Sequence, residues 1–315
     1  MLALLKSEAS HRGLPACVLT FEPHPRDYFA TRAGKPEAAP SRIATLRDKL
    51  SELARCGMDQ VVILPFNDHM AALTAEAFID DVLVEGLGAR YVLVGDDFCF
   101  GARRKGDYAM LDRNGAAKGF DVARMNSYQV HGLRVSSSAV RQALEAGDLA
   151  AAASLLGRPF CVSGHVIHGA KLGRQLGFRT MNLRFGRHTH PAAQGIFAVR
   201  VCGLENDPQA PPIEGVASLG KRPTVDDSGR VLLEVHALDW PASLGVEGAY
   251  GRLVRVELLH KLRDEARYEG LEALTAAIRQ DVVDAREWFA AQRGGTAAPS
   301  SEHAAQRRQT TRDRI

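Results

Sequence analysis

The stretch from Gly164 to Asn182 decides how this chain is interpreted, and it reads GHVIHGAKLGRQLGFRTMN. An apolar strand pattern runs into a glycine-rich loop that closes on Thr180 and Asn182. The glycines and cations of this loop are Gly169, Lys171, Gly173, Arg174 and Gly177. Glycines let backbone amides approach an anion closely, and lysine and arginine neutralise phosphate charge. The loop therefore predicts a site that binds phosphates.

Thr180 and Asn182 offer neutral oxygens, which suit Mg²⁺ because this ion keeps most of its water in proteins. Phosphate-binding amides, cations and a Mg²⁺ ion together are what phosphoryl transfer needs. A glycine-rich surface loop with solvated charges would contain the same residue types. The choice between these two interpretations depends on the rest of the chain.

A second segment, residues 232–238, reads LLEVHAL. Its alternation predicts a strand with the apolar side chains on one face and with Glu234 and His236 on the other. Without the phosphate loop, Glu234 would be interpreted as an ordinary solvent-facing carboxylate. Beside such a loop, Glu234 becomes a candidate base.

Seven motifs follow one another in the second half of the chain. They are Gly157-Arg158-Pro159-Phe160, Gly164-His165-Val166, Gly173 through Asn182, Gly195-Ile196-Phe197-Ala198, Gly220-Lys221-Arg222-Pro223-Thr224, Leu233-Glu234-Val235-His236 and Leu262-Arg263-Asp264-Glu265. In order and spacing, the segment from Gly157 to about Phe289 resembles the riboflavin kinase domain. It departs from that family at Arg179, where the family has proline, and at Met181, where alanine is usual.

This resemblance implies a role for each residue of the candidate site. Glu234 would accept the proton of the riboflavin 5′-hydroxyl while the γ-phosphoryl group of ATP is transferred. Thr180 and Asn182 would help to place Mg²⁺, and Arg263 lies in a segment that resembles the flavin-side flap. The ATP phosphates would be held by Gly169, Lys171, Gly173, Arg174 and Gly177.

Three motifs in the first half resemble the FMN adenylyltransferase module of the bacterial bifunctional enzyme that makes FMN from riboflavin and FAD from FMN. They are Thr20-Phe21-Glu22-Pro23-His24-Pro25, Gly95-Asp96-Asp97-Phe98-Cys99-Phe100-Gly101 and Arg134-Val135-Ser136-Ser137-Ser138-Ala139-Val140-Arg141. Ser138 replaces a threonine of the family and keeps a hydroxyl. The implied nucleotide- and flavin-binding residues are His24, Asp96, Phe98, Gly101, Arg104, Ser137 and Arg141.

The start of the sequence departs from that module. The family opens with a strand and a Gly-Asn-Phe-Asp-Gly-x-His-x-Gly-His loop, whereas this sequence opens at Met1 with what resembles the next helix. We therefore expect the first strand and the histidine loop, about 30 residues, to be missing and FAD synthesis to be impaired. The alternative is a monofunctional riboflavin kinase with a non-catalytic flavin- or nucleotide-binding N-terminal module.

With 315 residues, the chain exceeds what one core usually holds, so two domains are expected. Residues 1–156 alternate apolar runs (16–21, 60–66 and 91–95) with helical patterns (44–56 and 75–87), which predicts a Rossmann-like α/β nucleotidyltransferase domain with a parallel, doubly wound sheet. Ligands bind at the carboxyl ends of such strands, where His24 and Asp96 lie.

Residues 157–293 contain strand patterns separated by turns rich in Gly, Pro, Asn and Asp, which favours an antiparallel barrel. The resemblance implies six strands. One helix follows, and its apolar face is predicted to pack on the barrel through Leu271, Leu274, Ile278, Val282, Ala285 and Phe289. Residues 294–315 are expected to form a disordered tail.

The net charge of +3 is mild and scattered, and no basic patch is interleaved with aromatic residues, so nucleic acid is not an expected partner. No apolar run is long enough to span a bilayer, so a membrane is not expected either. The five cysteines are widely spaced, which predicts reduced, buried thiols in a cytoplasmic protein. The expected partners are small molecules: riboflavin, FMN and ATP.

Overall fold

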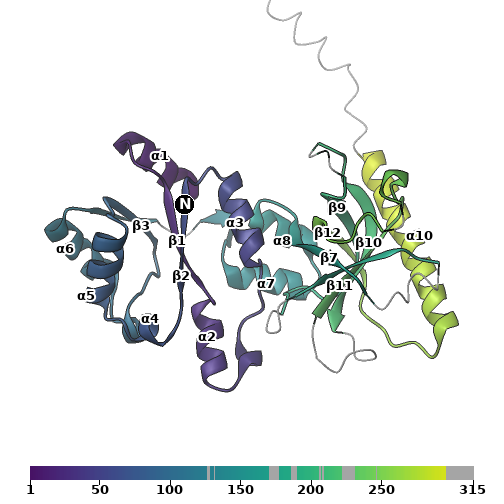
Figure 1. The fold of residues 1–315 in the computed structure, drawn as a ribbon, viewed down its shortest axis with the longest axis horizontal. Coiled ribbons are helices and arrows are strands. Elements are labelled where there is room, and N and C mark those ends of the chain that lie inside the picture. The colour runs from purple at the N-terminus through teal and green to yellow at the C-terminus, as the bar shows by residue number, and fades with distance from the viewer. Residues whose placement is uncertain are drawn as a thin grey trace, which may run out of the picture.

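The fold is taken from a computed structural model, which describes residues 1–125, 128–130, 132–169, 177–185, 190–205, 207, 209–221, 231–245 and 247–295. An α/β part precedes an antiparallel barrel, and a long helix follows (Figure 1). The elements of the first part are α1 Leu2–Arg12, β1 Cys17–Glu22, α2 Pro25–Arg32, η1 Pro36–Ala38, α3 Leu46–Arg55, β2 Gln60–Pro65, α4 Asp68–Ala72, α5 Ala75–Ala77, η2 Phe78–Gly86, β3 Tyr91–Gly95, η3 Ala102–Arg104, α6 Tyr108–Lys118, β4 Asp121–Met125, β5 Gln129–Val130, β6 Leu133–Arg134, α7 Ser137–Glu145 and α8 Leu149–Leu156.

The parallel strands expected from the sequence are confirmed as β1, β2 and β3 to within about a residue at each end. They do not form one continuous sheet in the part of the chain that the structure describes. β1 pairs in parallel with β2, and β3 pairs in parallel with β4. Leu19 and Phe21 of β1 nevertheless pack against the same buried cluster as Val92 and Val94 of β3. The two strand pairs therefore share one core on this face.

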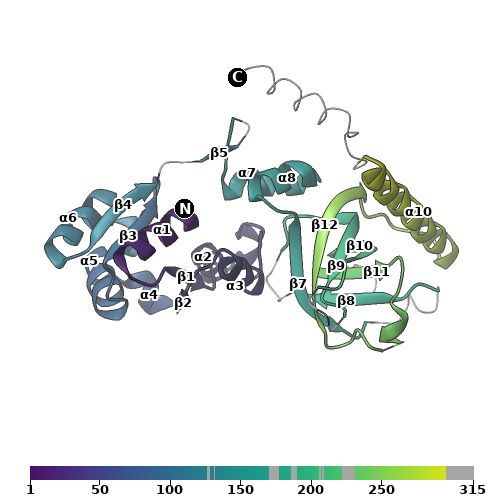
Figure 2. The same ribbon diagram turned by 90° about the horizontal axis from the view of Figure 1, so that it is seen from above.

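The second part is a closed, antiparallel six-stranded barrel with the strand order β10-β11-β8-β7-β12-β9, as the family resemblance implied (Figures 1 and 2). Its strands are β7 Phe160–Ile167, β8 Thr180–Arg184, β9 Gly195–Cys202, β10 Ile213–Lys221, β11 Val231–Ala237 and β12 Leu253–Arg263, with a 3₁₀ turn, η4 Ala242–Leu244, between the last two. β8 was not predicted as a strand, because the Thr-x-Asn segment was interpreted as the close of a loop. The helix α10, Leu271–Gly295, follows β12.

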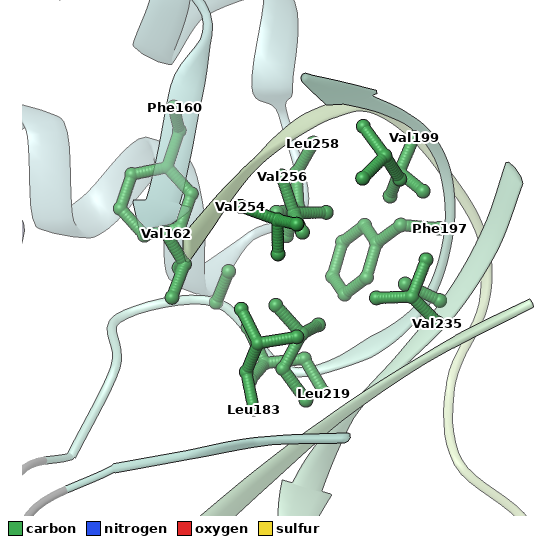
Figure 3. Packing of buried hydrophobic residues seen from close by; sticks show 14 of the residues in the cluster. Phe160, Val162, Leu183, Phe197, Val199, Leu219, Val235, Val254, Val256 and Leu258 are labelled. Carbon is green, nitrogen blue, oxygen red and sulfur yellow. The ribbon is translucent and has the colours of Figure 1, made fainter. Parts of the chain in front are cut away.

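Alternate residues of the strands fill the barrel interior (Figure 3). Phe197, Leu219, Val235 and Val256 point into it and are fully buried. This inward set also fixes which residues face outward, because successive side chains of a strand point to opposite faces. The alternation predicted for β11 is therefore confirmed.

Helices α7 and α8 add apolar side chains to the barrel core. Val140 and Leu144 of α7, and Leu149, Ala152 and Leu155 of α8, belong to the same buried cluster as the barrel strands. The expected domain boundary between residues 156 and 157 stays a prediction. A cut at that point would remove these five side chains from the cluster that they help to form.

The C-terminal helix packs on the outside of the barrel through only part of its predicted face. Ala285 and Phe289 are buried against Ile196, Ala198 and Val216 of the barrel. Leu271 is 55% exposed, so its predicted packing is wrong. It is the first residue of the helix and lies beyond the part that covers the barrel. α10 extends through Gly295, and the rest of the expected tail, residues 296–315, lies outside the described residues.

All five cysteines are free thiols. The prediction that they are buried holds for Cys161, whereas Cys17 and Cys202 are half-buried. It is wrong for Cys56 and Cys99, which are exposed in the turn that follows α3 and in the loop that follows β3. Within the described ranges, no helix combines the length and the apolar character that crossing a membrane requires.

Two candidate active sites

The outer face of three barrel strands carries a row of polar side chains. Leu233 and Val235 of β11 point into the barrel, so Glu234 between them points outward. The antiparallel register places Glu234 opposite Asn182 of β8 on one side and opposite Ser218 of β10 on the other. The Cβ atoms of such register partners lie about 4.5–5.5 Å apart. Asn182, Glu234 and Ser218 therefore form one row across three strands.

Asn182 is unusual for a polar residue because it is only 4% exposed. Its Oδ1 has no hydrogen-bond partner in the part of the chain that the structure describes. A Cβ atom at Gly169 would lie 2.3 Å from its Nδ2, so a side chain at position 169 would displace the Asn182 amide. Thr180 shares the outward face, because Met181 between them is buried in the barrel. These neutral oxygens fit Mg²⁺, which prefers oxygen ligands.

His236 lies two residues beyond Glu234 on the same face, opposite Thr180. Its Nδ1–H donates a hydrogen bond of 2.8 Å to the backbone oxygen of Arg179, since a carbonyl can only accept. Burial lowers the pKa of His236 below its usual range, the bond to Arg179 opposes this shift, and the charge of Arg286 adds to it. His236 therefore favours its neutral form.

Three residues of the predicted ATP-phosphate loop, Lys171, Gly173 and Arg174, lie outside the described residues. Gly177 ends that loop with φ +85°, a left-handed conformation that favours glycine. The side chain of Arg179, which replaces the family's proline, lies with its guanidinium 5.9 Å from the centre of the Trp240 ring. Arg179 is thus held on the outside of the barrel by a cation–π contact.

Arg263, the predicted flavin-side residue, makes a two-pronged ion pair with Asp281 of α10. Its Nε and Nη2 donate to the two carboxylate oxygens at 2.6 and 2.7 Å. Asp281 is buried, so this charge pair anchors the end of β12 to the helix. A role of Arg263 toward flavin stays a prediction.

The second candidate site lies at the carboxyl end of β1. His24 caps the N-terminus of α2, and its Nδ1 accepts a hydrogen bond of 3.2 Å from the backbone of Arg26. Arg42 pairs with Glu22 at 3.1 Å and with Asp27 at 2.5 Å. Burial lowers the pKa of His24, and the positive charge of Arg42 lowers it further.

Two residues of the α7 motif approach the same place. Ser137 is the first residue of α7, and Arg141 one turn later donates from Nε to the backbone oxygen of Ser41 at 2.7 Å. Arg141 also lies close enough to Arg26 for their charges to interact. The structure thus brings the predicted residues His24 and Arg141 to one neighbourhood, which is rich in cations.

Lys49 of α3 joins this cluster. Its Nζ donates to the hydroxyl of Thr20 at 3.1 Å, and burial lowers its pKa. Sequence reasoning missed both Lys49 and Arg42, because a single cation in a helical or loop pattern has no distinguishing spacing. Only the fold shows that they meet at the end of β1.

The remaining residues predicted for the N-terminal site lie in the segment that follows β3. Asp96 follows β3 and pairs with Arg134 at 3.2 Å. Phe98 stacks on Phe100 with 5.3 Å between ring centres. Gly101 has φ +71°, and a Cβ atom there would lie 2.6 Å from the backbone of Ala75, so packing alone requires this glycine. Arg104 is exposed and also has a positive φ, of 56°.

Two family models match this chain almost end to end. FAD synthetase matches residues 1–139, and riboflavin kinase matches residues 156–289. A curated Escherichia coli K12 protein, the bifunctional riboflavin kinase/FMN adenylyltransferase, is 45% identical over 92% of this chain and 87% of its own length. The chain belongs to the bifunctional riboflavin kinase/FMN adenylyltransferase family.

Other members of this family are also similar. The Pseudomonas fluorescens protein of the same name is 43% identical over 91% of this chain and 86% of its own length, and the Haemophilus influenzae protein is 38% identical over 92% and 89%. A solved structure from Streptococcus pneumoniae, described as a macrolide-efflux protein, matches with a TM-score of 0.70 and 26% identity over 91% of this chain and 88% of its own. That structure shares the fold of both parts.

Proposed function

We propose that this protein phosphorylates riboflavin to FMN at the barrel and adenylylates FMN to FAD at the N-terminal part, with ATP as co-substrate of both reactions. Both family models match in sequence order, and the similar curated proteins carry both activities in their names. The observation that carries the kinase assignment is the row of Asn182, Glu234 and Ser218 on the outer face of the barrel.

In the proposed kinase reaction, Glu234 accepts the proton of the riboflavin 5′-hydroxyl, which is a poor nucleophile without a base. Asn182 and Thr180 hold the divalent ion, which we propose is Mg²⁺, through neutral oxygens. When bound, the ion offsets the negative charge of the phosphoryl group. The unpartnered Oδ1 of Asn182 supports this assignment, because a buried amide oxygen without a partner costs free energy.

We also propose roles for the loop and flap residues that the sequence singled out. Gly169 and Gly177 border the ATP-phosphate loop, which contains Lys171, Gly173 and Arg174. Arg263 belongs to the segment that resembles the flavin-side flap, and we assign it a role on the flavin side of the site. Its ion pair with Asp281 supports a role in placing that segment.

In the proposed adenylyl transfer, the cations at the end of β1 neutralise the ATP phosphates. Ser137 and Arg141 act there with His24. Asp96, Phe98, Gly101 and Arg104 contribute the remaining contacts of the proposed nucleotide and flavin site. The cationic surroundings of His24 support this assignment, because phosphates bind where positive charge gathers.

The comparisons do not favour the alternative of a monofunctional kinase with a non-catalytic module, because the FAD synthetase model matches as well. The expectation that a strand and a histidine loop are missing concerns residues beyond this sequence and stays a prediction. We place the enzyme in the cytoplasm, with riboflavin, FMN and ATP as its partners.

The test is incubation of the full chain with riboflavin, ATP and Mg²⁺, followed by chromatographic separation of riboflavin, FMN and FAD. FMN formation that stops when the metal is chelated supports the kinase assignment. A second incubation, with FMN in place of riboflavin, isolates the adenylyl transfer. Absence of both FMN and FAD in the first reaction would reject the kinase, and absence of FAD in the second would favour the monofunctional alternative.

A further inference from the structure

Glu265 reaches back from the connection between β12 and α10 onto the outer face of the barrel. The hydroxyl of Ser218 on β10 donates a hydrogen bond of 3.1 Å to its Oε1. A Cβ atom at Gly220, two residues further along β10, would lie 2.0 Å from its Oε2. The carboxylate of Glu265 therefore occupies the space that any side chain at position 220 would need.

This position places Glu265 beside the candidate base. Ser218 is the register partner of Glu234, so the contact with Ser218 brings Glu265 to the same face of the barrel. Neighbouring strands lie about 4.7–4.9 Å apart. The two carboxylates thus approach Ser218 from different sides, Glu234 from the neighbouring strand and Glu265 from the connection. Glu265 is exposed, so its carboxylate can accept hydrogen bonds from a bound molecule.

We propose that Glu265 binds the secondary hydroxyls of the ribityl chain and so makes the kinase specific for a polyol side chain; this proposal rests on the proposed kinase function. The terminal hydroxyl of riboflavin must reach Glu234 to be deprotonated. The carbons next to it carry secondary hydroxyls, and one strand spacing separates Glu234 from Ser218. Because the proposed metal ligands lie on the Asn182 side of Glu234, a ribityl chain that extends to the other side has those hydroxyls over Ser218 and Glu265.

A carboxylate suits this task because it only accepts hydrogen bonds, and hydroxyl groups donate them. Such charge-assisted bonds are stronger than neutral ones. A site that is built to bind hydroxyls also discriminates strongly against an analogue that lacks them, because its polar groups are then left unpaired. Glu265 would therefore act on substrate choice, whereas Glu234 acts on proton transfer.

The competing role for Glu265 is structural, since the bond to Ser218 could simply hold the connection against β10. The two roles are separated by a flavin that carries a 5-hydroxypentyl chain at N10. This analogue keeps the terminal hydroxyl and lacks the secondary ones. A structural role affects both substrates equally, whereas hydroxyl binding affects riboflavin alone.

The experiment measures kcat/KM of the full chain for riboflavin and for the analogue, in the parent protein and in three variants. Glu265→Ala removes the carboxylate. Gly220→Ala leaves Glu265 in the sequence but displaces its carboxylate. Glu269→Ala, an exposed carboxylate in the same connection, is the matched control.

We expect Glu265→Ala to lower kcat/KM for riboflavin by about 10- to 100-fold, the usual loss of a hydrogen bond to a charged group. For the analogue the loss should stay below about threefold. Gly220→Ala should follow the same pattern with a smaller effect, and Glu269→Ala should match the parent.

Equal losses on both substrates would overturn the proposal in favour of a structural role. An unchanged kcat/KM for riboflavin in Glu265→Ala would overturn it as well. A parent protein that makes neither FMN nor FAD from riboflavin would instead reject the kinase function itself, so the two failures are distinguishable.

Discussion

The two parts of this molecule build their candidate sites by different means. In the barrel, every strand is hydrogen-bonded on both sides, and the register alone brings Asn182, Glu234 and Ser218 into one row. In the N-terminal part, β1 and β3 each have one partner strand among the described residues. The site there is gathered by side chains of helices and loops, such as Arg42 and Lys49. One site is positioned by the backbone and the other by ion pairs.

This contrast predicts which changes the two sites tolerate. A site positioned by backbone register should lose activity when a reacting side chain is replaced. The other side chains of that site should stay in place, because the strands still hold them. A site positioned by ion pairs should lose its shape when one charge is removed. Four measurements on single-residue variants test this difference between the two sites.

Glu234→Gln keeps the size of the side chain and removes the proposed base. We expect kinase turnover to fall by about 10²–10⁴-fold, with unchanged folding because Leu233 and Val235 still hold the strand. FAD formation from added FMN should be unaffected, because that site lies elsewhere. Turnover of riboflavin and of FMN, measured side by side, tests both statements. Near-normal riboflavin turnover would show that Glu234 is not the base.

Leu144→Ala tests whether α7 belongs physically to the barrel. Leu144 is 1% exposed within the barrel core, so its truncation should lower the free energy of unfolding of the barrel by about 2–5 kcal/mol. Both tryptophans, Trp240 and Trp288, lie in the second half of the chain, so their fluorescence in urea reports on that half. The matched control is Leu111→Ala in the other core, which should leave this transition unchanged. A shift of equal size in both variants would mean that the two parts unfold as one unit.

Arg42→Ala tests the dependence of the N-terminal site on ion pairs. Glu22 and Asp27 would both lose their partner, and Oε2 of Glu22 is already buried without one among the described residues. We expect a local destabilisation of about 1–3 kcal/mol, measured as faster amide hydrogen exchange in β1. The control Arg32→Ala breaks an exposed pair with Asp68 and should cost less than about 1 kcal/mol. Unchanged exchange in Arg42→Ala would show that the N-terminal site does not depend on these ion pairs for its shape.

The pH dependence of barrel stability should contain a small contribution from His236. Its pKa is lowered in the folded protein, mainly by burial, so the unfolded chain takes up the proton first as the pH falls. The contribution of His236 is therefore fully present above its ordinary pKa of about 6.5 and is lost below it. Urea unfolding at pH 7.5 and 5.5 should show a larger loss for the parent than for His236→Gln. The same loss of stability between pH 7.5 and 5.5 in the parent and in His236→Gln would exclude His236 as its source.

The sequence predicted most of the fold, because strand and helix periods are local. The alternation at Glu234 and the apolar runs of β1, β2 and β3 are confirmed almost to the residue. β8 was missed because Gly177 and the loop before it dominate the local pattern. Leu271 was wrongly predicted to pack on the barrel, because the helical period does not show where the contact between the helix and the barrel ends.

The candidate sites were predictable only where residues carry a family motif. Glu234 and Asn182 came from such motifs, and the register then placed them side by side. Glu265 belongs to a quoted motif too, but its approach to Ser218 follows from the return of the β12–α10 connection over the barrel. Lys49 has no motif at all. Contacts between distant segments depend on tertiary packing, which a single sequence does not reveal.

The sharing of one core between α7, α8 and the barrel has a consequence for biosynthesis. The apolar faces of both helices leave the ribosome before β12, which starts at Leu253 and contributes Val254, Val256 and Leu258 to that core. At about 5–20 residues per second, these faces wait on the order of ten seconds for the strands that cover them. During that interval the nascent chain exposes apolar surface that is prone to aggregation, and the barrel closes only after its last strand has been made.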